Sequence, residues 1–313
     1  MIFIDWISPK AHAAINRNLL EALCIRRAKL YVFEPALENP DHDTAVLAST
    51  EGRLARAMQV FRICWRHRRD KIFLLSYDPV LVPFLQLYCR RLYVYEHNTT
   101  PEGATYIRHA LWQRLFYHRI LRFAQFPGQH TVLRELGQQS VYLGSPLSED
   151  LSDVSRHTPR LFLAPSARAR MTELARVARF LDGAEVVMRQ LHYSEEGPET
   201  PRSEVNIRLV TWIDFQALLP EIRAIIITIE SRIRGSGWFH EAFVFGVPLI
   251  ITHPDMCALF EETYPGYPYV RLDSVRSPEE LETALGRAEA IDRSTYAITH
   301  NSAIRARFEF AIA

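Results

Sequence analysis

AIIITIESRIRGSGWFHEAFVFGVPLIIT, residues 224–252, is the stretch that decides the fold. Residues 224–229 contain four isoleucines and no charge, which is typical of a strand buried on both faces of a sheet. A turn of small and polar residues follows, and Gly246-Val247-Pro248 ends a predicted helix over 238–245. Residues 247–252 indicate a second buried strand. Because a helical crossover joins parallel strands, the stretch predicts a β–α–β unit.

The same alternation of short apolar runs and helical runs extends over the whole chain. Strands are predicted at 2–6, 29–33, 72–76, 92–96, 123–126, 141–143, 161–164, 185–188, 207–210, 224–229 and 247–252. Between them lie segments with helical spacing, such as Leu54, Met58, Phe61 and Trp65. The pattern predicts the α/β class, with two Rossmann-like parallel-sheet domains. Since ligands bind at the carboxyl ends of parallel strands, we expect the two domains to face a cleft that holds the site.

The boundary between the domains is predicted where turn chemistry interrupts the alternation. The run from Gly144 to Asp150 contains glycine, serine and proline, and Thr158-Pro159 closes a polar stretch. We therefore expect an N-terminal domain over 1–146, a linker over 147–160 and a C-terminal domain over 161–296. A last helix over 297–313 could pack back on the N-terminal domain.

The turn before the helix at 238–245 has the chemistry of a phosphate site. Gly235 and Gly237 let a ligand approach the backbone closely, and Ser236 can cap the helix. The N–H groups at the helix start attract an anion, and Arg234 adds positive charge. Glu241, one turn into the helix, can accept hydrogen bonds from two vicinal ribose hydroxyls. The alternative interpretation is an ordinary capped helix with a surface carboxylate.

This stretch resembles the donor-binding segment of GT-B glycosyltransferases. Their pattern is a small-residue loop, a helix with Glu-Ala, a Gly-x-Pro and a buried strand, matched here by Gly235-Ser236-Gly237, Glu241-Ala242, Gly246-Val247-Pro248 and Leu249–Thr252. The resemblance implies that Glu241 binds the ribose of a nucleotide. Many retaining members carry a second glutamate eight positions earlier, where this chain has Ile233. The resemblance therefore assigns neither a retaining mechanism nor a subfamily.

Further donor contacts are expected in the loops after neighbouring strands. In similar enzymes the loop after the first strand of the second domain supplies a cation to the diphosphate, which points to Arg168 and Arg170, and more weakly to Arg189 after the next strand. The loop after the strand ending near residue 210 contacts the nucleobase in such folds. Trp212 could stack there or pack in the core. Solvated surface arginines are the alternative for each Arg.

Three polar residues at predicted strand ends of the first domain are candidate catalytic groups. Transfer to a hydroxyl needs a base that takes its proton as the oxygen attacks the anomeric carbon. Glu96 and His97 end one strand, and Asp5, the second choice, ends another. Alternatively, Glu96 and His97 cap the following loop through hydrogen bonds. Asp78, which precedes Pro79, is interpreted as a helix cap.

Positive charge is concentrated in the first domain. Residues 53–122 contain 13 basic and four acidic residues, although the net charge of the chain is +1. The segments Arg62–Arg69 and Arg108–Arg122 combine arginines with aromatic residues. Solvated helix faces explain this, and so does peripheral binding to an anionic membrane surface. We expect no nucleic-acid partner, because the chain has no global basic excess and no recognisable nucleic-acid-binding module.

No pattern indicates a metal or cofactor site or a membrane span. The four cysteines form no CxxC pair: Cys24, Cys64, Cys89 and Cys257. Asp41-His42-Asp43 lies in a proline-flanked loop. The apolar N-terminus is too short for a signal peptide, and no run approaches the roughly 18 apolar residues of a span. We expect a cytoplasmic protein, peripheral at the inner face of the membrane at most, that needs no metal.

The expected function is transfer of a sugar from a nucleotide-diphosphate sugar to a glycan or lipid-linked acceptor, in bacterial surface polysaccharide biosynthesis. Two alternatives remain open: a nucleotide-sugar epimerase of the same fold, and a GT-B-like protein that binds nucleotide sugar without turnover.

Overall fold

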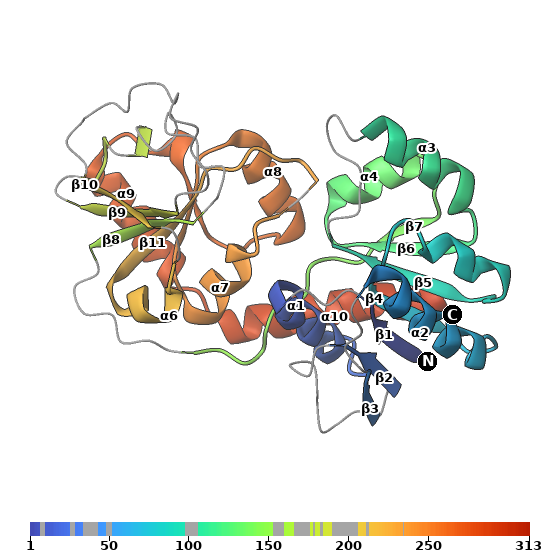
Figure 1. Cartoon of the computed structure of the whole chain (residues 1–313). Coiled ribbons are helices and arrows are strands. Elements are labelled where there is room, and N and C mark those ends of the chain that lie inside the picture. Colours follow the sequence, from blue (N-terminus) through green and yellow to red (C-terminus); the bar gives the residue numbers. More distant parts are fainter. Residues whose placement is uncertain are drawn as a thin grey trace. The chain divides into compact units, whose positions relative to one another are not determined.

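The computed structural model divides the chain into two compact units, residues 1–147 with 299–313, and residues 148–298. Both chain ends lie in the first unit (Figure 1). The structure describes residues 1–6, 10–25, 29–33, 43–47, 52–97, 106–152, 160–165, 176–177, 179–181, 184–189, 206–210, 213–233 and 235–313.

The first unit is built on a seven-stranded sheet in which every neighbouring pair is parallel. The strands, in sheet order, are β3 (Asp43–Val46), β2 (Lys29–Val32), β1 (Ile2–Asp5), β4 (Ile72–Ser76), β5 (Leu92–Glu96), β6 (Ile120–Ala124) and β7 (Ser140–Tyr142). The chain therefore starts in the middle of the sheet and adds strands outward on each side. At the centre, β1, β4 and β5 end at one edge, where Asp5, Ser76 and Glu96 lie.

Helices cover both faces of this sheet (Figure 1). They are α1 (Lys10–Ala22), α2 (Arg53–Arg66), the 3-10 helix η2 (Val82–Leu87), α3 (Tyr106–Phe116), α4 (Pro127–Glu135) and α10 (Arg293–Ile312). One core joins α2 and η2 to the sheet, and the other joins α1 and α10 to it. Such double coverage explains why the strands are continuously apolar.

The second unit is built on a six-stranded parallel sheet. The strands, in sheet order, are β10 (Asn206–Val210), β9 (Glu185–Arg189), β8 (Leu161–Ala164), β11 (Ile222–Ile227), β12 (Leu249–Ile251) and β13 (Val270–Arg271). Its helical elements are α6 (Phe215–Leu218), η4 (Leu219–Glu221), α7 (Trp238–Phe245), α8 (Pro254–Thr263), η5 (Leu272–Ser274) and α9 (Pro278–Glu289), besides the first turns of α10. The predicted α/β class with two parallel sheets is confirmed.

The end of the chain belongs to the first unit. Ile304 and Phe308 of α10 are buried in its core. The Asn301 amide accepts a hydrogen bond from the Leu147 N–H at 3.1 Å and donates one to the Leu147 carbonyl at 2.9 Å. Arg307 donates to the Leu143 carbonyl at 3.0 Å. These contacts tie α10 to the segment that leaves β7.

The helical spacing of Leu54, Met58, Phe61 and Trp65 predicted the helix α2, but of these residues only Phe61 packs against the core. Leu54 is 71% exposed and Trp65 is 56% exposed, and Met58 is exposed as well. The buried residues are instead Ala57, Val60, Ile63 and Cys64. These are mostly smaller side chains, which let the helix approach the sheet closely, so the large apolar side chains remain on the solvent face.

The start of strand β6 differs from the prediction. The strand predicted at 123–126 is β6, which begins at Ile120. Arg122 lies in the middle of this strand and is fully buried. Its charge interrupts the apolar pattern in the sequence, so the first residues of the strand were not predicted.

The loop predicted around Asp41-His42-Asp43 contains strand β3, which begins at Asp43; residues 41 and 42 lie outside the described ranges. Among the described helices, none combines the length and apolar character needed to cross a bilayer.

Candidate functional site

The segment between β11 and α7 leaves the carboxyl edge of the second sheet and ends at Gly235-Ser236-Gly237, the turn before the helix. Gly237 is the residue before the helix, with a φ of −58°. The Ser236 hydroxyl accepts a hydrogen bond from the Trp238 N–H at 3.4 Å, so it helps to cap the helix. A Cβ placed on Gly237 would meet no atom within 4 Å. The start of α7 is therefore open on the side of Gly237.

The other end of α7 is fixed by Gly246. Its φ of 62° is left-handed, and its N–H donates to the Phe243 carbonyl at 3.3 Å. The Val247 N–H donates to the Ala242 carbonyl at 2.8 Å. This pair of bonds is the usual way in which a glycine ends a helix. It turns the chain directly into β12 and so fixes the helix beside β11.

Glu241 lies in the first turn of α7. Its side chain is exposed, and within the described residues it has no ion pair or hydrogen bond. Partial burial nevertheless raises the pKa of its carboxyl above the ordinary value. A carboxylate without a protein partner, held near an open helix start, is suited to accept hydrogen bonds from a ligand.

Two described charged residues of this segment, Arg232 and Glu230, have partners at the start of α8. Arg232 pairs with Asp255 at 2.9 Å, and His253 lies 3.7 Å from Glu230. Ile233 is buried. The position at which retaining GT-B members carry a second glutamate therefore points an apolar side chain into the protein.

Most of the remaining donor candidates cannot be placed. Arg168, Arg170, Trp212 and Arg234 lie outside the described residues, and Arg189 is described only as the last residue of β9. The sheet order puts β9, β8 and β11 side by side, so the segments that follow them leave from the same edge.

An aromatic pair at this edge was missed by the sequence analysis. The half-buried Trp238 at the start of α7 packs edge-on against Phe215 of α6, with ring centroids 5.3 Å apart. Phe215 follows β10, the strand after which a nucleobase contact was expected. Tryptophan at the first position of the helix was the available signal, but it was interpreted only as part of the helical run.

In the first unit, Glu96 belongs to a buried ion pair. Arg122 donates to Glu96 Oε1 at 2.7 Å and the Tyr77 hydroxyl donates to it at 2.5 Å. Both charged side chains are fully buried. Burial would lower the pKa of Arg122, but the negative charge of Glu96 outweighs this and raises it. The geometry favours a structural role for Glu96 and argues against its action as a base.

Arg122 is bound on its other nitrogens as well. It donates to Gln113 Oε1 at 2.7 Å and to the Tyr77 hydroxyl at 3.2 Å, and its guanidinium lies 4.8 Å from the Tyr117 ring centroid. Burial raises the pKa of Tyr77 well above the ordinary value, so its hydroxyl remains a donor. The cluster is a satisfied polar network inside the core.

His97 and Asp5 are brought together through Asn16. His97 Nε2 lies 2.9 Å from Asn16 Oδ1 and 2.9 Å from the Leu75 carbonyl. Asn16 in turn donates to Asp5 Oδ2 at 3.1 Å, and the Ser76 hydroxyl donates to Asp5 Oδ1. Since Nε2 faces two acceptors, it carries the hydrogen of the neutral ring, and Nδ1 is the nitrogen that can take up a proton. All of these side chains are buried at the carboxyl edge of β1, β4 and β5.

Asp78, interpreted from the sequence as a helix cap, caps instead the turn Pro79–Leu81 that leads into η2, whose own N-terminal cap residue is Leu81. Its carboxylate accepts from the N–H groups of Val80 at 2.9 Å and Leu81 at 3.0 Å, and it pairs with Arg53 at 2.7 Å. Burial would raise the pKa of Asp78, but these partners hold it below the ordinary value. Among the described residues no group of three or more acidic, histidine or cysteine side chains could hold a metal ion.

Comparison with solved structures identifies the fold of the chain. The chain matches HepE from Anabaena, solved in complex with UDP-glucose, over 97% of its length and 93% of that chain, with a TM-score of 0.57 and 12% identity. The chain has the GT-B fold. A glycosyltransferase from Rickettsia africae shares it, with a TM-score of 0.55 and 12% identity over 99% of this chain and 95% of that one. No protein-family model matches the sequence, and no curated protein matches it.

The GT-B likeness extends over nearly the whole chain and includes both units. HepE has also been solved with UDP, at a TM-score of 0.56. At such low identity the likeness concerns the fold, so the chemistry of this chain must be argued from its own residues.

Proposed function

We propose that the chain is a glycosyltransferase that takes a sugar from a nucleotide-diphosphate sugar. The observation that carries the proposal is Glu241, a carboxylate without a described protein partner at the open start of α7, beside the central strand β11. The GT-B fold, shared with an enzyme solved with UDP-glucose, supports it. The proposed acceptor is a glycan or lipid-linked glycan of bacterial surface polysaccharide synthesis, and the proposed location is the cytoplasm.

In this proposal the diphosphate lies at the turn Gly235-Ser236-Gly237. The N–H groups of Phe239 and His240 already bond to the carbonyls of Ser236 and Gly237, both at 3.1 Å. The phosphate would therefore meet the backbone of the turn itself and the Ser236 hydroxyl. The proposed cations that bind the diphosphate are Arg234, Arg168, Arg170 and Arg189. Trp212 is proposed to contact the nucleobase. Glu241 would accept hydrogen bonds from the two ribose hydroxyls.

His97 is the proposed base, with Asp5 and Asn16 as positioning residues. As the acceptor oxygen bonds to the anomeric carbon, its proton passes to His97 Nδ1. The bond from the anomeric carbon to the diphosphate oxygen breaks, and the nucleoside diphosphate leaves with that electron pair. The positive end of α7 and the arginines would stabilise the leaving charge, so we propose a reaction that needs no metal or other cofactor.

A ligand screen tests this function. We expect one of the UDP, GDP, CMP, TDP or ADP sugars to stabilise the protein by about 2.7 kcal/mol at 100 times its Kd, seen as a rise in Tm. Added acceptor should then release the nucleotide: the nucleoside diphosphate, or CMP if the donor is a CMP sugar. Stabilisation without release with any acceptor would indicate a binding protein, and interconversion of the donor sugar without acceptor would indicate an epimerase.

A further inference from the structure

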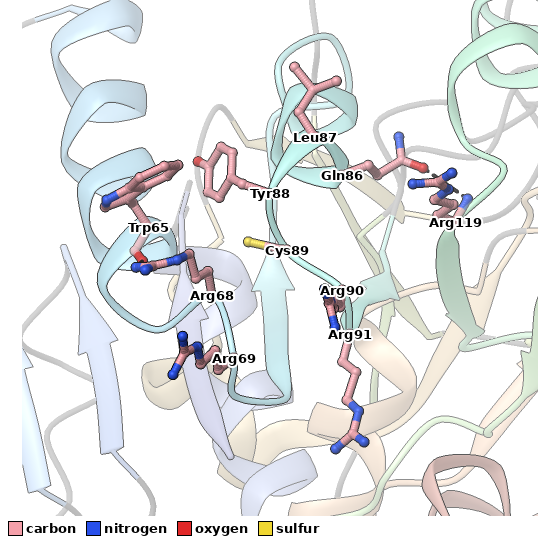
Figure 2. A pocket seen from close by; sticks show the side chains of 10 residues that line it. All are labelled: Trp65, Arg68, Arg69, Gln86, Leu87, Tyr88, Cys89, Arg90, Arg91 and Arg119. Atoms are coloured by element: carbon pink, nitrogen blue, oxygen red, sulfur yellow. Dashed lines mark hydrogen bonds between the residues drawn. The ribbon is translucent and has the colours of Figure 1, made fainter.

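A hollow of about 980 Å³ lies in the first unit, away from the candidate catalytic residues. Five arginines line it: Arg68, Arg69, Arg90, Arg91 and Arg119 (Figure 2). They precede β4, β5 and β6, so they lie at the amino edge of the sheet. His97 and Asp5 lie at the opposite, carboxyl edge. The hollow is therefore separate from the site proposed for transfer.

The charge of this hollow is not balanced by the described part of the chain. No acidic residue lines it, and none of its arginines pairs with a described carboxylate. Arg68 instead lies over the ring of Trp65, 5.0 Å from its centroid, and donates to the Trp65 carbonyl at 3.1 Å. The nearby Asp70 pairs with His67 at 3.0 Å. Like charges gathered in this way attract an anionic partner.

Exposed apolar side chains surround the same hollow. Leu87 at the end of η2 is 83% exposed, and Figure 2 shows it at the end of the hollow above Tyr88 and Gln86, pointing outward. A second hollow of about 450 Å³ shares Leu87 and Arg119 and is lined by Phe84, Trp112 and Phe116. Trp65, Phe84 and Phe116 are themselves exposed. Apolar groups beside cationic ones match the boundary between lipid headgroups and acyl chains.

We propose that this surface, the arginine face, docks on an anionic lipid bilayer. The five arginines contact headgroup phosphates, while Leu87, Phe84 and Phe116 enter the interfacial layer. A nucleic acid would meet the arginines but would leave the protruding Leu87 in water. Arg122, part of the segment Arg108–Arg122 first considered for this role, is buried in the ion pair with Glu96 and takes no part. The side chain of Arg108 lies outside the described residues.

Vesicle flotation with purified full-length protein tests the proposal. Wild type should bind vesicles that contain phosphatidylglycerol and should not bind pure phosphatidylcholine, and high salt should weaken the binding. Each arginine near an anionic surface contributes about 1 kcal/mol, so R90Q/R91Q should weaken binding about 30-fold. R276Q/R287Q, which removes two exposed arginines of the second unit, is the matched charge control.

The apolar contribution has its own pair of variants. Leu87→Ser should weaken binding several-fold, whereas Phe310→Ser should not, although Phe310 is as exposed. Phe310 lies on α10, which packs against the other face of the sheet. All variants should keep the thermal shift with nucleotide sugar, because the arginine face is distant from that turn in sequence and belongs to the other unit. That readout separates failure of this proposal from failure of the proposed function.

Three results would overturn the proposal. Equal binding to both vesicle types would show that charge is not recognised. An equal loss in R90Q/R91Q and R276Q/R287Q would show that binding is not located at the arginine face. Binding of a single-stranded oligonucleotide without binding of anionic vesicles would assign the hollow to nucleic acid instead.

Discussion

At the scale of single residues, the pair Glu96–Arg122 sets the clearest stability prediction. Glu96→Gln leaves the buried guanidinium without its counter-charge, which typically costs about 3–5 kcal/mol. Urea unfolding should show this as a lower midpoint. The double variant E96L/R122M removes both charges and should be more stable than E96Q alone. If E96Q unfolds at the wild-type midpoint, the ion pair has no structural role.

His97 carries the prediction on turnover. His97→Gln keeps a hydrogen-bonding side chain but removes the base, so kcat should fall by about 100-fold or more. The thermal shift with nucleotide sugar should be unchanged, since the donor turn lies in the other unit. Gln129→Ala is a useful comparison, because Gln129 donates to the backbone carbonyl of His97 at 2.8 Å and accepts from the N–H groups of Gln125 and Phe126, so its loss disturbs the surroundings of His97 but keeps the ring. Full turnover by H97Q would remove His97 from the mechanism.

Glu241 gives a pH prediction with a definite sign. Burial raises its pKa in the folded state above the unfolded value. The charged form is therefore the less favourable one in the folded protein, and stability decreases as pH rises through that interval. At pH 7, Glu241→Gln should raise the Tm of the free protein while it weakens donor binding. A lower Tm for E241Q without ligand would contradict this assignment.

Residue roles were only partly predictable from sequence. The identities of Glu96, His97 and Asp5 as strand-end residues could be predicted, because strand ends are visible in the apolar pattern. The partner of Glu96 could not, since Arg122 lies 26 positions away and inside a strand that its own charge concealed. Asn16, which joins His97 to Asp5, lies in a helix whose pattern carries no sign of that contact.

At the scale of elements, Gly246 fixes how α7 ends. Gly246→Ala forces a side chain into left-handed backbone, at a cost of about 1–2 kcal/mol. The new Cβ would also lie 2.9 Å from the Arg293 guanidinium carbon. Urea unfolding should show the loss. Gly237→Ala, in helical backbone with open space, is the control and should leave the unfolding midpoint nearly unchanged. Equal midpoints for both variants would contradict this reading of the turn.

Elements were predicted well where composition and burial agree. The strands β4, β5 and β8 and helix α7 have the predicted bounds, because uninterrupted apolar runs and a Gly-x-Pro stop are local signals. The apolar spacing in α2 predicted the helix but does not mark its buried face, since Leu54, Met58 and Trp65 are exposed. Of these exposed side chains, Trp65 lines the hollow of the arginine face.

At the scale of the whole molecule, the two parallel sheets could be predicted because buried parallel strands leave a repeated apolar signature. The sheet orders could not be predicted, because nothing local says that β1 lies between β2 and β4. The return of residues 299–313 to the first unit rests on Asn301, Ile304 and Phe308, contacts between positions about 150 or more apart along the chain.

The central claim is a nucleotide-sugar site at the start of α7, and one titration tests it most directly. The nucleotide sugar that stabilises the wild type is titrated calorimetrically into wild type, Glu241→Ala and Glu221→Ala. Glu221 is an exposed carboxylate in the same unit, just before β11 at the opposite edge of the sheet. We predict at least a tenfold weaker Kd for E241A and an unchanged Kd for E221A. Equal affinity of E241A and wild type would contradict the account.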